Sequence, residues 1–287
     1  MNIFNFTEQQ DYDKEYKYNI LVYPNITYMR DLEKDSYVVV LRNVIKELNK
    51  TSWGKMIHWT ILSPYEVKSL IFENTEQLPI ELPSYPNAMR THFNHKQLIK
   101  TIDWKNRDYD LIYSHLPEHT LQLSNMFVNE TNINPKIIGY CHWYEVPENT
   151  AYSKTMLHHN VAGMLEMSEC GVNTEWLKEL VLEKVGQSYH QRIIAQLDNI
   201  IQPHYLGVDL ISTGHEYKPK TILFNHRDNE YTGWAWFVKR MDELWEKRQD
   251  FKVYLTLADL DRPYAERVKL SSRDDYLNFV RSMHMGI

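Results

Sequence analysis

The stretch TILFNHRDNEYTGWAWF, residues 221–237, changes character twice within one short segment. Its β-branched and apolar beginning predicts a buried strand, and its aromatic end predicts the start of a helix. A helix N-terminus beside a guanidinium favours a diphosphate, because backbone amides and the helix dipole attract negative charge. The segment therefore predicts an anion site between strand and helix. The residues predicted to form it are His226, Arg227, Thr232 and Gly233.

Strand and helix signals alternate on both sides of this stretch. The alternation predicts an α/β fold with parallel sheets, whose ligand sites lie at the carboxyl ends of the strands. The turn-rich segment 211–220 predicts a boundary near Thr213, which divides the chain into domains 1–213 and 214–287. Strands are predicted in 18–24, 55–64, 108–119, 135–148, 199–210, 220–225 and 250–257, and helices in 37–50, 95–104, 172–186, 233–248 and 273–284.

Composition limits the class of protein. Of the 287 residues, 43% are hydrophobic and 24% are charged, which suits one or two globular domains. No apolar run is long enough to cross a bilayer and no leader pattern is present, so we expect a cytoplasmic protein without a membrane partner. Cys141 and Cys170 lack metal-ligand or disulfide spacing and are predicted to be reduced, buried thiols.

Polar residues also follow two predicted strands of the first domain. His115 stands in YSHLPEH with Glu118, and His142 stands in CHWYEVPE with Glu145. One histidine at a strand end is more often structural than catalytic, but three such loops favour a shared site, because parallel strands end at one edge. The sequence has no glycine-rich phosphate loop, nucleophile elbow or HExxH motif, so side chains must do most of the binding.

The order of these segments resembles retaining glycosyltransferases of the GT-B fold. That family has an S-x-x-x-K type helix, an I-P-x-G-V-D turn and a G-R-x-x-x-x-K-G loop. Here VNTEWLKELVLEKVG, QPHYLGVDL and the loop with Arg227 and Gly233 follow in the same order. The loop departs from the family at Thr232, where lysine is usual, and Lys239 or His226 would supply the missing charge. DLIYSHLPE is similar to the family's D-x-x-H-x-H-E-P strand end.

This resemblance implies a fold, an activity and residue roles. The fold implied is GT-B-like, with two Rossmann-like domains, 1–213 on the acceptor side and 214–287 on the donor side. The activity implied is retaining transfer of a sugar from a nucleotide-sugar, a UDP-sugar, to an acceptor hydroxyl, without a metal or other cofactor. His115 matches the histidine close to the transfer centre and is the catalytic candidate. The acceptor-side candidates are His142, Glu145 and Glu118.

Residues 226–256 also resemble glycosyltransferases of large tailed bacteriophages, some of which modify hydroxymethylated cytosine in DNA. It implies double-stranded DNA as the acceptor and the cytoplasm of a host cell as the location. A basic stretch with interleaved Phe93 and Trp104 would face phosphates or bases, but a solvated amphipathic helix explains the same pattern. The net charge of −6 also disfavours a polyanion partner. The candidate contacts are Arg90, Lys96, Lys100, Lys105 and Arg107.

The second domain is short for this family. Residues 214–287 hold two strand-helix units and an apolar end that is typical of a third strand, whereas ordinary domains have roughly 150 residues. We therefore expect an incomplete second domain in a truncated or shortened chain. Two alternatives stay open. One is an inactive transferase frame that binds nucleic acid or a protein, and the other is an α/β enzyme, such as a sugar-phosphate epimerase, that uses its histidines as acid and base.

Overall fold

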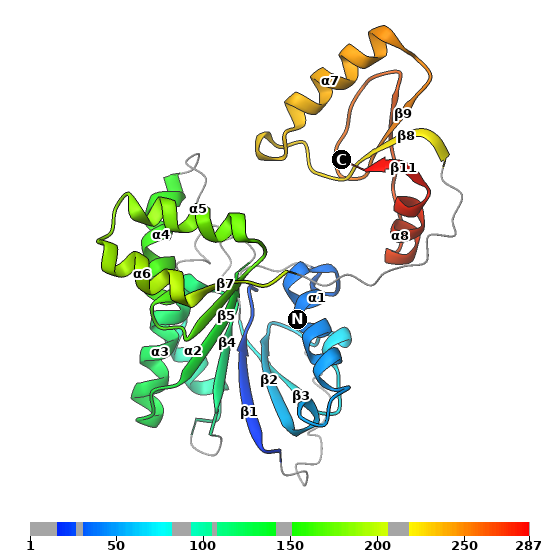
Figure 1. The fold of residues 1–287 in the computed structure, drawn as a ribbon. Helices are drawn as coiled ribbons and strands as arrows, with labels where there is room; N and C mark the ends of the chain where they lie inside the picture. Colours follow the sequence, from blue (N-terminus) through cyan, green and yellow to red (C-terminus); the bar gives the residue numbers. More distant parts are fainter. Residues whose placement is uncertain are drawn as a thin grey trace. The chain divides into compact units, whose positions relative to one another are not determined.

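Two compact units, residues 1–207 and 208–287, make up the chain (Figure 1). Each unit is built around a parallel sheet of its own, which confirms the predicted α/β class with two parallel-sheet units. The computed structural model describes residues 16–26, 31–81, 93–104, 108–141, 151–205 and 218–286.

The sheet of the first unit has seven parallel strands within the described residues, in the order β3-β2-β1-β4-β5-β6-β7. The order changes direction between β1 and β4, and ligands of such sheets bind beyond the carboxyl ends of the two strands at that point. The strands are β1 Tyr18–Tyr23, β2 Ile57–Ser63, β3 Thr75–Pro79, β4 Leu111–Ser114, β5 Lys136–Cys141, β6 Glu169–Val172 and β7 Ile201–Pro203.

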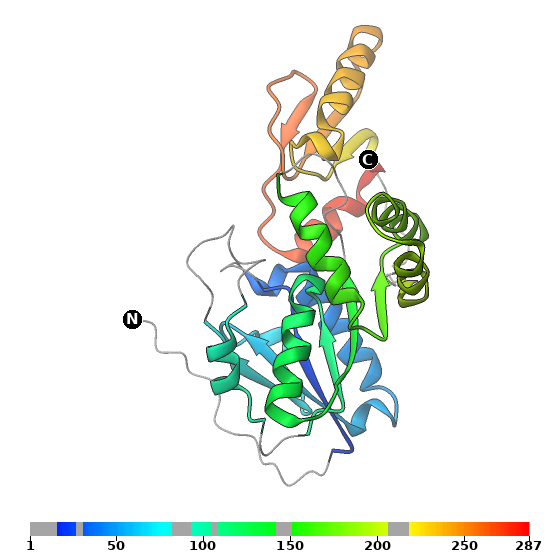
Figure 2. The same ribbon diagram turned by 90° about the vertical axis from the view of Figure 1, so that its left-hand side faces the viewer.

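Helices cover both faces of this sheet (Figures 1 and 2). Leu21 of β1 joins the apolar cluster that includes residues of α2, α3, α5 and α6, whereas the next residue, Val22, joins the cluster packed under α1. A strand buried on both faces has no solvated side, which explains its unbroken apolar run. The helices are α1 Ser36–Leu48, α2 His95–Thr101, α3 Pro117–Thr131, α4 Ala151–Met164, α5 Glu175–Gly186 and α6 Gln191–Ile200, with short 3₁₀ turns η1 Leu32–Lys34, η2 Gly54–Met56 and η3 Lys68–Leu70.

The second unit repeats this plan on a smaller scale. Its described strands are all parallel, in the order β10-β9-β8-β11, so the direction changes between β8 and β11. Phe237 of α7 packs in the core on one face, and Phe279 of α8 meets Tyr254 of β9 edge-on on the other. The elements are β8 Lys218–Phe224, η5 Glu230–Thr232, α7 Trp234–Lys247, β9 Lys252–Leu255, β10 Ala265–Arg267, α8 Arg273–Arg281 and β11 Met283–Gly286.

Two tryptophans of amphipathic helices are exposed. Trp176 of α5 is 67% exposed, because the buried stripe of that helix runs through Leu177, Val181 and Val185, one position further round. Trp236 of α7 is 60% exposed for the same reason, and Arg240 lies over its ring, 5.6 Å from the centroid. The Trp236 side chain therefore does not anchor α7 to the sheet.

Several elements were not predicted from the sequence. These are β3, β6, β10, α3, α4 and α6. β6 has only four residues, and α4 carries polar residues all round, so neither shows a clear period. α4 and β6 complete the strand-helix alternation between β5 and β7. Cys141 and Cys170 are buried free thiols, as expected.

Candidate functional site

The central strand of the second unit ends at the point where its sheet changes direction. β8 ends at Phe224, and Asn225, His226 and Arg227 follow at its carboxyl end. The His226 ring is exposed and lies edge-on to Phe224, with 5.8 Å between ring centroids. Phe224 is buried in the core and fixes the end of the strand. The sheet thus delivers the predicted His-Arg pair to the edge where ligands of such folds bind.

Arg227 has a charge that no described residue neutralises. Its guanidinium is exposed and has neither a hydrogen-bond nor an ion-pair partner in the described part of the chain. Four other arginines of this unit are paired with carboxylates: Arg240 with Glu243, Arg248 with Asp250, Arg262 with Asp242, and Arg267 with Asp259. Arg281 donates to Asn278 Oδ1. An unpaired guanidinium at a strand end can bind an anion in a bidentate manner without first breaking an ion pair.

The loop after Arg227 is closed by its own hydrogen bonds. The Thr232 hydroxyl lies 2.7 Å from the Arg227 carbonyl oxygen and 2.6 Å from that of Asn229, and its backbone N–H donates to Asn229 as well. Gly233 has φ +73°, a left-handed conformation that glycine adopts without strain, and its N–H donates to Glu230. Thr232 and Gly233 therefore shape the loop, and α7 begins one residue later, at Trp234.

Lys239 lies in an acidic environment. It lines an open hollow of about 610 Å³ beside α7. The same hollow is lined by five carboxylates, those of Asp242, Glu243, Glu246, Asp259 and Asp261. Asp242, Glu243 and Asp259 are ion-paired with arginines, but none of the five carboxylates attracts a diphosphate, so this setting disfavours Lys239 as the replacement for the lysine that is usual at position 232 in the family.

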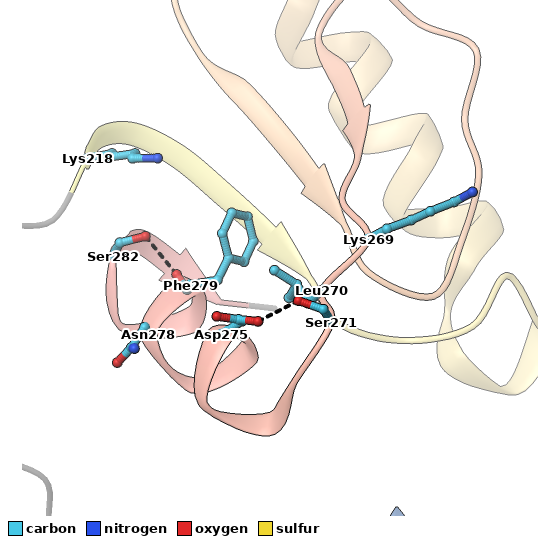
Figure 3. A pocket seen from close by; sticks show the side chains of 8 residues that line it. All are labelled: Lys218, Lys269, Leu270, Ser271, Asp275, Asn278, Phe279 and Ser282. Atoms are coloured by element: carbon cyan, nitrogen blue, oxygen red, sulfur yellow. Dashed lines mark hydrogen bonds between the residues drawn. The ribbon is translucent and has the colours of Figure 1, made fainter.

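A second hollow, of about 560 Å³, lies beside α8 (Figure 3). Lys218 and Lys269 line it, but the figure shows their side chains well apart and not directed at a common point. Asp275 lies between them and accepts a hydrogen bond from Ser271 at 2.7 Å. The two lysines consequently do not form an anion site together.

In the first unit, His115 follows β4 at the point where the sheet changes direction. Its backbone N–H donates to the carbonyl oxygen of Tyr23, the last residue of β1, at 2.9 Å. Its ring is only 1% exposed and packs against Tyr37 and Tyr113, with centroids 5.2 and 4.7 Å away. The structure thus places the catalytic candidate in a buried aromatic setting at the carboxyl end of β4.

Glu118 and His119 lie in the first turn of α3, directly after His115 in the chain, and both are buried. His119 Nδ1 is hydrogen-bonded to the Tyr23 hydroxyl at 3.0 Å. Burial, reinforced by the Glu118 carboxylate, raises the pKa of Tyr23 far above its ordinary value. Tyr23 therefore stays protonated, and the cluster forms a buried polar layer at the carboxyl ends of β1 and β4.

Other predicted residues lie outside the described part of the chain. These are His142 and Glu145 on the acceptor side, and Arg90, Lys105 and Arg107 in the basic stretch. Lys96 and Lys100 lie on α2 and are exposed. Trp104 is buried and packs edge-on against Phe127, 5.3 Å between centroids, so it cannot stack on a base as the sequence pattern suggested. Of the five predicted nucleic-acid contacts, the structure therefore describes only Lys96 and Lys100.

A polar cluster that sequence reasoning missed joins the ends of two strands to a helix. The Thr256 hydroxyl donates to Asn225 Oδ1 at 2.6 Å, and Asn225 Nδ2 donates to the hydroxyl of Tyr276. Asn225 follows β8, Thr256 follows β9, and Tyr276 lies on α8. The signal available in the sequence was that Asn225 and Thr256 each lie at the carboxyl end of a predicted strand, in 220–225 and 250–257.

Neither a metal site nor a membrane span is found in the described residues. No group of three or more histidine, cysteine, aspartate or glutamate side chains is placed to hold an ion there. Within the same part of the chain, no helix has both the length and the apolar composition that a bilayer span requires.

Comparison with known proteins gives a clear result for the fold alone. The sequence matches no protein-family model, and it matches no curated protein at a significant level. Solved structures are similar in three dimensions at 10–12% sequence identity, and each covers 93% of this chain. This chain spans between 72% and 78% of the length of those structures.

Three of these structures illustrate the likeness. A UDP-forming trehalose-phosphate synthase from Burkholderia xenovorans, in complex with glucose-6-phosphate, has a TM-score of 0.59 at 11% identity and is covered over 78% of its length. HepE of Anabaena, in complex with UDP and glucose, has a TM-score of 0.57 at 12% identity and is covered over 73%. The lipopolysaccharide galactosyltransferase WaaB has a TM-score of 0.50 at 10% identity and is covered over 72%. The chain therefore has a fold similar to that of GT-B glycosyltransferases.

Proposed function

We propose that this chain is a glycosyltransferase that binds the diphosphate of a nucleotide-sugar at the carboxyl end of β8. The observation that carries the proposal is the exposed, unpaired guanidinium of Arg227 at the point where the second sheet changes direction. Neighbouring arginines are paired with carboxylates, so a ligand anion is the natural partner for this one. His226, beside Arg227, would donate a second hydrogen bond to the diphosphate oxygen atoms.

The likeness to GT-B structures supports a UDP-sugar as the donor, since the HepE structure holds UDP and glucose. In the proposed reaction, the bond between the sugar and the diphosphate breaks while an acceptor hydroxyl attacks the sugar. Negative charge grows on the leaving diphosphate, and a fixed guanidinium stabilises that charge more in the transition state than in the ground state. The proposal includes retention of configuration and independence from metal ions, as in the family that the sequence resembles.

The acceptor side of the proposal is assigned to the first unit. His115, Glu118 and His119 support it by their place after β4, at the change of strand order. Because the His115 ring is buried, we assign it a role in orienting neighbouring groups of the first unit rather than in touching the substrate. His142 and Glu145 stay proposed acceptor-side residues from the sequence.

Nucleotide binding by calorimetry tests the donor site. Wild-type chain is titrated with UDP and with UDP-glucose, with and without a chelator, beside Arg227→Ala and the control Arg240→Ala. Arg240 is also an exposed arginine of this unit, but it pairs with Glu243. Loss of a charged hydrogen-bonding group costs about 1.5–3 kcal/mol, so Arg227→Ala should weaken UDP roughly 10- to 100-fold while the control changes little. Equal affinity in Arg227→Ala and wild type would refute the assignment.

The nature of the acceptor is a finer proposal. Hydroxymethylcytosine in DNA is the acceptor that the phage likeness suggests, and exposed Lys96 and Lys100 on α2 support a contact with its backbone. Incubation of modified DNA with UDP-glucose and the chain should add the mass of one sugar to the nucleoside. Salt-dependent DNA binding without UDP affinity or mass shift would instead favour a non-catalytic binding module.

A further inference from the structure

Asn225 is held from two sides at the edge of the second sheet. Its side-chain oxygen accepts a hydrogen bond from Thr256 Oγ1 at 2.6 Å, and its amide nitrogen donates to the Tyr276 hydroxyl. All three side chains are half-buried, where a hydrogen bond is less weakened by competing water than at the open surface. Asn225 is thus fixed in both position and orientation.

The three residues come from segments that are far apart in the chain. Asn225 and Thr256 are separated by 31 positions, and Asn225 and Tyr276 by 51. Asn225 follows β8, Thr256 follows β9, and Tyr276 lies on α8. Phe279 of α8 packs on Tyr254 of β9. The cluster therefore ties two strand ends and a helix together at the place where the β8–α7 loop leaves the sheet.

The far end of that loop has hydrogen bonds of its own. Thr232 and Gly233 close its far end through backbone hydrogen bonds to Asn229 and Glu230. His226 and Arg227 lie between these two fixed points, one and two residues after Asn225. The direction in which the backbone leaves Asn225 consequently sets where the Cα of Arg227 lies, and with it the space that the guanidinium can reach.

We propose that Thr256 and Tyr276 are positioning residues that act through Asn225 to hold Arg227 in place for a nucleoside diphosphate. This inference rests on the proposed function, since it concerns the same anion site. It assigns Thr256 and Tyr276 no contact with the ligand. Their effect on diphosphate binding must therefore shrink when Arg227 is absent, and what remains acts through His226, which directly follows Asn225.

A double-mutant cycle with UDP tests this coupling. Tyr276→Phe and Thr256→Val each remove one hydroxyl at nearly constant volume. Each should weaken UDP by about three- to tenfold in the wild-type background, and by less than about twofold in Arg227→Ala, because one hydrogen bond is lost and its effect runs through the guanidinium. Thr256→Ser keeps the hydroxyl and should restore the affinity. Equal weakening in both backgrounds would overturn the proposal.

Hydrogen exchange of the loop gives a readout that needs no ligand. The amides of Thr232 and Gly233 should exchange several-fold faster in Tyr276→Phe than in wild type, because the loop loses its fixed start. Tyr264→Phe is the matched control: it removes a phenol hydrogen bond to Asp242 in the same unit and should change neither exchange nor UDP affinity. Unchanged exchange in Tyr276→Phe would overturn the proposal that Tyr276 positions the loop through Asn225. A wild-type chain that fails to bind UDP would overturn only the proposed function.

Discussion

Gly163 of α4 is the position at which a single methyl group should do most damage to the first unit. A Cβ built on Gly163 would lie 1.7 Å from the carbonyl oxygen of Pro117, in the first turn of α3. Even the 3.0 Å that real Cβ atoms essentially never go below would require the two backbones to separate by 1.3 Å. Neither helix backbone can yield as a flexible side chain does. The glycine is therefore required by the close crossing of the helices.

The expected magnitude follows from two opposing terms. Alanine is better than glycine within a helix by about 1 kcal/mol, and overpacking of a rigid contact costs about 1–3 kcal/mol or more. Because Gly163 meets backbone, we expect the upper part of that range and a net loss of about 2 kcal/mol in the free energy of unfolding. Gly186 of α5 is the matched control, since its Cβ would meet only Ile194 Cδ1 at an ordinary 3.5 Å. Gly186→Ala should be neutral or stabilising by about 0.5 kcal/mol.

Urea unfolding of the full chain is monitored by hydrogen exchange of peptides from β4 and α3. These peptides report the free energy of unfolding of the first unit separately from that of the second. Opposite signs for Gly163→Ala and Gly186→Ala are the expected result. A Gly163→Ala variant that is as stable as wild type would refute the close crossing of α3 and α4. The variant should also disturb the first turn of α3, which carries Glu118 and His119, because that turn lies at the crossing.

Three further predictions concern other parts of the molecule. Phe237→Ala should destabilise the second unit by about 3–5 kcal/mol in urea unfolding, whereas Trp236→Ala on the same helix, whose side chain is 60% exposed, should change it by less than about 0.5 kcal/mol. The raised pKa of Tyr23 gives stability that is present below the ordinary phenol pKa of 10.0 and is lost as pH rises above that value. Tyr23→Phe should therefore flatten the decline of the unfolding free energy at high pH. An unaltered slope would refute the role of Tyr23 in this decline. A chelator should leave UDP affinity unchanged in calorimetry, and a loss of affinity that Mg²⁺ restores would refute metal independence.

The elements that sequence patterns predicted well are those with a strong local signal. The apolar run of β1 and the polar cap of α5 are local features, and Thr174 does accept a hydrogen bond from Leu177 N–H at 3.1 Å. Short or mixed segments such as β6 and α4 were missed, because their residues are selected by contacts across the sheet rather than by their neighbours in sequence. Gly163 is an example, since its role depends on Pro117 in another helix.

The chain order by itself determined that a cation follows a buried strand and precedes a helix, and the structure places Arg227 at that point. Only the tertiary structure decided which polar residues are accessible. Trp104 and His115 are buried by side chains from distant segments, and Asn225 gained two partners from Thr256 and Tyr276. The physical reason is that burial and hydrogen bonding depend on how close residues lie in space, which a linear spacing reports only within a strand or a helix turn.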